Sequence, residues 1–211
     1  MEQNMDLWMQ NGNGVFIDIH EKLRSYSDVI RFLKIVEEKE GILQYCNGNN
    51  SRGRLLFQIF STEFIQSIAE IITNAKGPIL EVMAGDGKLV EFLGSRVDKE
   101  IIATDSKNYT YDIQYPDWIL EYDAMQSLDD FDPSFVILCW EPLYSDVGDK
   151  IARSGHPLIW IGDPNRCAPK SGLLEREHIR MNSKYAIGRY DSIIDEVYNT
   201  DIYLFNIDMK N

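Results

Sequence analysis

The spacing of apolar residues changes near Pro78. Before that point the pattern is helical. One helix is predicted to begin at Ser27 or Asp28 and to end near Gly41, with an apolar face made of Val29, Ile30, Phe32, Leu33 and Val36. A second helix is predicted after Ser61, with Phe64, Ile65, Ile68, Ile71 and Ile72 on one face. Residues 1–60 are therefore expected to form a helical extension or cap on the remainder, residues 61–211.

From Pro78 onward, short apolar runs alternate with helical segments. The runs predict strands at residues 79–83, 101–104, 118–121, 135–139, 158–162 and 202–207. Helices are expected between them, at residues 89–96, near Ser127, at 146–153 and at 173–183. Short apolar strands separated by helices indicate a mostly parallel sheet that is covered on both faces. The expected fold is therefore a doubly wound α/β domain.

The composition narrows the possible partners and compartments. The formal net charge of −13 argues against duplex nucleic acid, because phosphate binding requires a basic surface. A local basic patch is conceivable from Arg52, Arg54, Arg176, Arg180, Lys184 and Arg189. No apolar run approaches the roughly 20 residues that cross a bilayer, and the start of the chain does not resemble a signal peptide. The odd number of separated cysteines fits reduced thiols, so a cytoplasmic location is expected. No metal site is expected.

The strongest functional signal is the run Glu81-Val82-Met83-Ala84-Gly85-Asp86-Gly87, in which a strand leads through a glycine turn into a helix. A P-loop is excluded, because Val82 and Leu89 stand where a glycine and a Ser or Thr are needed. A dinucleotide turn is disfavoured, because Val90 occupies the place of its third small residue. The next predicted strand ends in Asp105, an acid placed to bind ribose hydroxyls.

With its acid, small residues and Gly-x-Gly, this run resembles the first motif of class I S-adenosylmethionine-dependent methyltransferases, (D/E)-x-G-x-G-x-G. Met83 departs from the pattern at the first glycine. The resemblance covers residues 60 to 207 and implies a Rossmann-like sheet and S-adenosyl-L-methionine as the cofactor. It also implies a closing antiparallel hairpin, whose sixth strand is not evident in residues 186–200.

The resemblance assigns cofactor contacts by position. Glu81 would lie near the amino group, and the turn formed by Ala84, Gly85, Asp86 and Gly87 near the methionine and ribose portions. Asp105 would accept both ribose hydroxyls, and Ser106 would border the adenine. Asp123 and Ala124, after the third strand, match the usual place of the acid that accepts from the adenine amine. Cys139 ends the fourth strand, which is expected to flank the same crevice. A residue such as Asp105 or Asp123 can also be a plain turn or capping residue.

The chemistry is expected after the fourth strand, where Glu141-Pro142-Leu143-Tyr144 resembles the (D/N)-P-P-(Y/F) motif of amino-group methyltransferases. Glu141 would take the proton of an amine acceptor. Tyr144 is the second predicted catalytic residue and would form a flat wall with Trp140. Trp140, Pro142 and Asp163 are the predicted substrate-binding residues.

Three functional hypotheses follow. The first is a methyltransferase that acts on an amine or another small-molecule or protein acceptor. The second is a catalytically inactive methyltransferase-like module that binds a partner, which the departures at Met83 and in residues 141–144 favour. The third is another nucleotide-dependent enzyme on the same fold. The sequence leaves the acceptor and the oligomeric state open.

Overall fold

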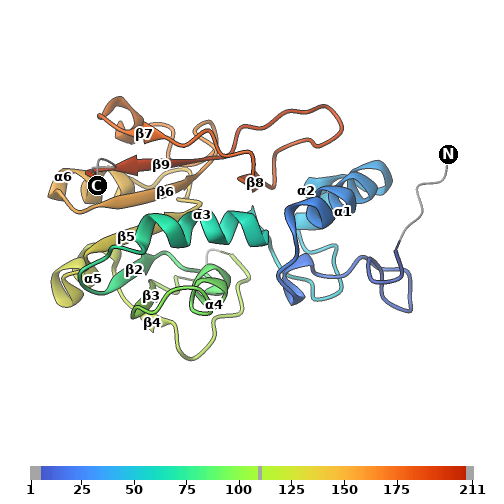
Figure 1. The fold of residues 1–211 in the computed structure, drawn as a ribbon, viewed down its shortest axis with the longest axis horizontal. Coiled ribbons are helices and arrows are strands. Elements are labelled where there is room, and N and C mark those ends of the chain that lie inside the picture. Colours follow the sequence, from blue (N-terminus) through green and yellow to red (C-terminus); the bar gives the residue numbers. More distant parts are fainter. Residues whose placement is uncertain (1–5, 109–110, 208–211) are drawn as a thin grey trace.

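A seven-stranded sheet forms the centre of the computed structural model, which describes residues 6–108 and 111–207 (Figure 1). Its strand order is β4-β3-β2-β5-β6-β9-β7. The strands are β2 (Ile79–Val82), β3 (Ile101–Asp105), β4 (Leu120–Glu121), β5 (Phe135–Cys139), β6 (Leu158–Gly162), β7 (Ile179–Arg180) and β9 (Asp201–Phe205). The pairs from β4 to β6 are parallel, whereas β9 runs antiparallel to both β6 and β7. The predicted doubly wound, mostly parallel fold is confirmed.

Alternating side chains of the strands face two separate helical layers. Ile79 of β2 packs in one core with α3 (Thr62–Ile72) and α4 (Lys88–Leu93). Its neighbour Leu80 packs in a second core with α5 (Ala124–Phe131) and α6 (Val147–Ser154). A strand turns successive side chains to opposite faces, which is why one apolar run serves both layers. Glu81 follows in the alternation and points to the α3/α4 side.

The predicted helix at 173–183 is wrong. The segment holds only a short 3-10 helix, η2 (Leu173–Glu175), before β7. Ile179 pairs with Leu204 of β9, and Arg180 donates to the Asp201 carboxylate at 2.7 Å. Partners distant in the chain therefore decide the conformation of this stretch. The antiparallel edge strand that was not evident in residues 186–200 is β7, which pairs with β9 and lies earlier in the chain.

The N-terminal segment contains η1 (Ile19–Glu21), α1 (Tyr26–Lys39), α2 (Ile42–Cys46) and β1 (Gln58–Ile59). Helix α1 begins where Ser25 accepts the amide of Asp28, close to the predicted start. The segment has its own apolar core, which also takes in Ile187 and Ile193 from near the C-terminus. Strand β1 pairs with β8 (Ile187–Gly188) in a separate two-stranded antiparallel sheet. The segment thus lies at the end of the main sheet where the parallel strands finish (Figure 1).

Within the described residues, no helix is both long enough and apolar enough to cross a bilayer.

Candidate functional site

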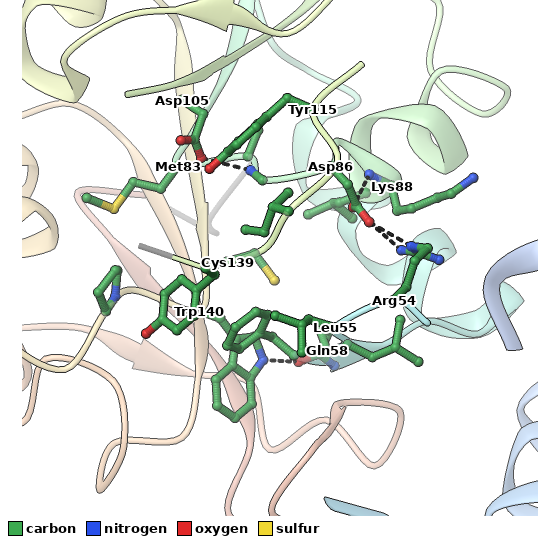
Figure 2. Close-up of a pocket in the computed structure, with 18 of the residues that line it drawn as sticks. Arg54, Leu55, Gln58, Met83, Asp86, Lys88, Asp105, Tyr115, Cys139 and Trp140 are labelled. Carbon is green, nitrogen blue, oxygen red and sulfur yellow. Dashed lines mark hydrogen bonds and ion pairs between the residues drawn. The ribbon is translucent and has the colours of Figure 1, made fainter. Parts of the chain in front are cut away.

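A cavity of about 940 Å³ opens at the carboxyl ends of β2, β3 and β5. The strand order reverses between β2 and β5, and such a crevice is the usual ligand site of open α/β sheets. Its lining comes from the turn after β2, the loop after β3, residues 139–143 after β5, and residues 52–58 and Phe60 of the N-terminal segment. In Figure 2, Asp105 and Asp86 lie on one side of the cavity and Trp140 and Gln58 on the opposite side.

The turn after β2 is held by the acid that ends β3. The Gly85 amide donates to Asp105 Oδ2 at 2.9 Å, and the Lys107 amide donates to Asp105 Oδ1 at 2.8 Å. Gly85 and Gly87 both have positive φ, at 57° and 71°. This geometry connects the two predicted motifs directly, because the carboxylate of one fixes the backbone of the other.

Gly87 has a packing role in this turn. A Cβ at this position would lie 2.3 Å from the Trp118 ring and 2.7 Å from Ile119 Cδ1. Any larger residue would therefore displace these side chains. Gly87 does not line the cavity, whereas Ala84, Gly85 and Asp86 do.

Met83 stands at the first glycine position of the motif and has φ 54°. This left-handed conformation costs an L-residue roughly 1–2 kcal/mol, which explains why glycine suits the position. The turn therefore keeps its shape without the glycine, at the expense of strain, and Met83 contributes to the cavity wall.

Glu81 is the buried acid of the site. It is 2% exposed and lines the cavity, and its Oε2 has no hydrogen-bond partner among the described residues. Burial raises the pKa of Glu81 well above its usual value, and the nearby charges of Asp86 and Asp105 raise it further. An unpaired buried carboxyl is costly unless a partner reaches it, so this atom is a candidate contact for a cationic group of a ligand.

The remaining predicted cofactor residues divide into two sets. Ser106 and Cys139 line the cavity, and burial raises the pKa of the Cys139 thiol well above its usual value. Asp123 and Ala124 lie outside the lining. Asp123 instead caps α5, accepting the amides of Met125 and Gln126 at 2.9 and 3.1 Å.

The two predicted catalytic residues differ in their relation to the cavity: Glu141 is one of its lining residues, but its carboxylate is bonded within the protein, whereas Tyr144 is not a lining residue. Glu141 is 1% exposed, and its carboxylate accepts from Ser145 Oγ, the Gly148 amide and Trp160 Nε1 at 2.7, 2.9 and 3.0 Å. These partners belong to the α6 side of the sheet, and the three bonds hold the carboxylate there. Tyr144 is 92% exposed and is not among the lining residues. Their predicted roles in proton transfer stay predictions, with the Glu141 carboxylate engaged by three donors and Tyr144 exposed.

Backbone geometry explains this arrangement. Trp140 has φ 63°, and its amide donates to the Ile161 carbonyl at 2.8 Å. The left-handed residue changes the direction of the backbone after β5: Trp140 lines the cavity, and the Glu141 carboxylate is bonded to Gly148 and Trp160 on the α6 side. Pro142 lines the cavity, as predicted for a substrate-binding residue. Asp163 does not; it is buried, and its Oδ1 accepts from the backbone and side-chain nitrogens of Asn165.

Residues from outside the sheet also close the cavity, and they were not predicted from the sequence. These are His20, residues 52–58 and Phe60 of the N-terminal segment, Asn108 and residues 111–116 of the loop after β3, and Asn165, Arg166 and Tyr190. No local motif marks them. Arg52 and Arg54 were considered only as members of a basic patch. In the structure Arg52 forms an ion pair with Glu21, and Arg54 forms ion pairs with Asp18 and Asp86. Arg176 and Arg180 are likewise paired, with Asp149 and Asp201.

A scan of protein-family models finds no match for this sequence, and neither does a search of curated proteins. Several solved structures are similar to the chain. One is precorrin-6y C5,15-methyltransferase from Geobacter metallireducens, with 12% identity, a TM-score of 0.42, and coverage of 69% of this chain and 88% of that one. Another is an S-adenosylmethionine-dependent O-methyltransferase from Thermotoga maritima, with 12% identity, a TM-score of 0.42, and coverage of 73% and 68%. A third is an S-adenosylmethionine-dependent methyltransferase from Archaeoglobus fulgidus, with 9% identity, a TM-score of 0.40, and coverage of 82% and 97%.

Each of these three is a methyltransferase. Identities this low concern the fold alone, and the fold of this chain is established by the strand order and register of its own sheet.

Proposed function

We propose that this protein binds S-adenosyl-L-methionine and transfers its methyl group to a small-molecule or protein acceptor. The observation that carries the proposal is the bond from the Gly85 amide to the Asp105 carboxylate at the mouth of the β2/β5 crevice. It joins the glycine turn to the acid that ends the next strand, and both line the same cavity. This is the arrangement that the resemblance requires for holding an adenosine.

The residues of the cavity fit this cofactor. Its amino group is a cation, and the unpartnered Oε2 of Glu81 offers a buried acceptor for it. Asp105 uses one hydrogen bond on each oxygen for the backbone, and a carboxylate oxygen retains a further lone pair for a hydroxyl. Ala84, Gly85 and Ser106 would lie along the rest of the molecule. We propose that Glu81 and Asp105 provide the polar anchors at its two ends.

When bound, the cofactor supplies an electrophilic methyl group on a sulfonium. The protein must then hold the acceptor in line with it and exclude water. Residues 52–58 and Phe60 of the N-terminal segment and residues 111–116 of the loop after β3 line the cavity, and they are suited to that exclusion. The buried position of Glu141 gives no support to this residue as a proton acceptor.

The second candidate is a binding module that retains the cofactor or the fold without catalysis. The specific observation in its favour is the position of the two predicted catalytic residues: three donors engage the Glu141 carboxylate, and Tyr144 is exposed. A methyl-donor turnover assay separates the two candidates, because only the first consumes S-adenosylmethionine when an acceptor is supplied.

The first test is calorimetric titration and thermal shift with S-adenosylmethionine, S-adenosylhomocysteine and NAD side by side. The first two ligands are expected to bind and NAD is not. At a ligand concentration of 100 times Kd, binding adds about 2.7 kcal/mol to the free energy of unfolding. Asp105→Ala should abolish binding, whereas Glu121→Gln, an exposed acid on the neighbouring strand, should not. No heat at millimolar S-adenosylmethionine would overturn the proposal.

A further inference from the structure

Four aromatic rings form a row along the wall of the cavity. The centroid of Tyr111 lies 5.4 Å from that of Phe57, Phe57 lies 6.2 Å from Trp140, and Trp140 lies 6.1 Å from Tyr190. All four residues line the cavity. Trp140 faces Asp105 across the cavity (Figure 2), so the row is on the side opposite the proposed ribose site.

Contacts between distant parts of the chain fix this row. Trp140 Nε1 donates to Gln58 Oε1 at 2.9 Å. A Cβ at Gly188 would lie 2.3 Å from the Trp140 ring, so the indole packs directly on the backbone there. Strand β1 carries Gln58, which pairs with Gly188 of β8. The rings are therefore supported by the short sheet that joins the N-terminal segment to the C-terminal region.

Two guanidinium groups lie against the faces of these rings. Arg166 is 4.8 Å from the Tyr190 centroid and lines the cavity, whereas Arg189 is 4.6 Å from the Phe57 centroid and does not line it. Arg189 is 6% exposed, and neither arginine forms a salt bridge with a carboxylate within residues 6–108 and 111–207. Guanidinium cations already lie against the Tyr190 and Phe57 rings, so these rings are poorly suited to a cationic ligand.

Several other charged residues of the lining have partners within the protein, and the Glu141 carboxylate accepts from three donors. Arg54 pairs with Asp86, and Lys88 pairs with Glu91. Asp112 follows Tyr111 and is exposed, at the end of the row away from Arg166. The exposed guanidinium of Arg166 is thus placed to meet an anion at the Tyr190 end.

We propose that the acceptor is a flat aromatic or heteroaromatic molecule bearing an anionic group, which stacks on the Phe57–Trp140–Tyr190 wall and places its anion at Arg166. That the bound molecule is a methyl acceptor rests on the proposed function, but the binding of such a molecule at this wall does not. The proposal replaces the amine acceptor suggested by the Glu141 motif, because three donors within the protein already engage the Glu141 carboxylate.

The test uses three probes with one ring system and different charge: 2-naphthoate, 2-naphthamide and 2-naphthylmethylammonium. Their binding is measured by calorimetry with and without saturating S-adenosylhomocysteine. Naphthoate should bind about tenfold more tightly than the ammonium probe, since a charge-assisted hydrogen bond to arginine lowers Kd by a factor of about ten or more. The indole N–H resonance of Trp140, assigned by its loss in Trp140→Phe, should shift with each bound probe.

Two variants locate the contacts. Arg166→Gln should remove the preference for naphthoate and leave naphthamide unchanged. Lys170→Gln is the matched control, because this exposed cation follows on the same loop but does not line the cavity. Tyr190→Leu should weaken all three probes by a similar factor.

The outcomes are distinguishable from those of the cofactor test. Naphthoate binding without S-adenosylhomocysteine binding would support this site and overturn the proposed cofactor. Equal or tighter binding of the ammonium probe, an unchanged preference in Arg166→Gln, or no binding of any probe would overturn the inference.

Discussion

The Arg54 guanidinium donates twice to the Asp86 carboxylate, from Nε at 2.8 Å and from Nη2 at 2.6 Å. Its Nη1 donates to Asp18 Oδ2 at 2.5 Å. Asp86 belongs to the glycine turn, whereas Asp18 caps η1 in the N-terminal segment. One side chain therefore ties the segment that closes the cavity to the turn proposed to hold the cofactor, as Figure 2 shows for its Asp86 end.

Arg54→Gln should be strongly destabilising. Asp18 is 1% exposed, and loss of its partner leaves a buried charge, which typically costs about 3 kcal/mol or more. Urea unfolding measures the change, and calorimetry should show weaker binding of S-adenosylhomocysteine because the turn loses a restraint. Arg52→Gln is the control. Its pair with Glu21 is exposed, so a change of no more than about 1 kcal/mol is expected. Equal effects of the two variants would show that the Arg54 bridge contributes little.

Met83→Gly and Met83→Ala form a matched pair that measures the strain in the turn. Both variants remove the side chain beyond Cβ, but only glycine adopts φ 54° without a steric penalty. The glycine variant should exceed the alanine variant in unfolding free energy by about 1 kcal/mol. Equal stabilities would mean that the turn relaxes to a conformation with negative φ in the alanine variant. Thermal or urea unfolding of the two proteins gives the difference.

Variants of Asp123 separate a capping role from the predicted contact with the adenine amine. Asp123→Ala should cost about 1 kcal/mol of stability, because the amides of Met125 and Gln126 lose their acceptor. Asp123→Ser should restore most of that loss, since serine also caps helices well. An unchanged affinity of Asp123→Ser for S-adenosylhomocysteine would assign the residue to capping alone. A large loss of affinity would place it in the adenine site.

The stability of the ligand-free protein should fall with rising pH through the titration of Glu81. Its folded-state pKa is raised, so the folded protein retains a proton that the unfolded chain releases above about pH 4.5. Stability is then full below that value and decreases, by up to about 1.4 kcal/mol per pH unit, until the folded pKa is reached. The Glu81→Gln variant has no titrating group at this position, so it lacks this pH-dependent contribution to the unfolding free energy. The difference in unfolding free energy between the two proteins, measured from pH 4 to 8, should widen as pH rises.

His20 contributes to the unfolding free energy with the opposite dependence on pH. Because both proteins contain His20, its contribution cancels in the difference between their unfolding free energies. Burial lowers the pKa of His20 to about 3, so its stabilising effect is present above pH 6.5 and is lost at lower pH in both proteins. A difference that is independent of pH would mean that Glu81 is not titrating abnormally. Addition of S-adenosylmethionine should release a proton from Glu81, detectable by calorimetry in buffers of different ionisation enthalpy.

Much of the fold was predictable because it depends on local periodicity. The strands at residues 79–83, 101–104, 135–139 and 158–162 follow from short apolar runs, and β2, β3, β5 and β6 occupy these positions. The predicted helix at 173–183 failed because its residues are recruited by β9 and by Asp201, which are distant in the chain. Local pattern has no information on such pairing.

By itself the sequence determined the sheet, the glycine turn and the position of Asp105, because strand alternation and turn chemistry act over a few neighbouring residues. Only the tertiary structure decided what surrounds them. It directed Glu141 toward α6 through the left-handed backbone of Trp140, and it brought Phe57, Tyr190 and Arg166 to one wall of the cavity. These residues are separated by many positions: Phe57 and Tyr190 flank β1 and β8, which pair with each other, and Arg166 comes from the segment after β6.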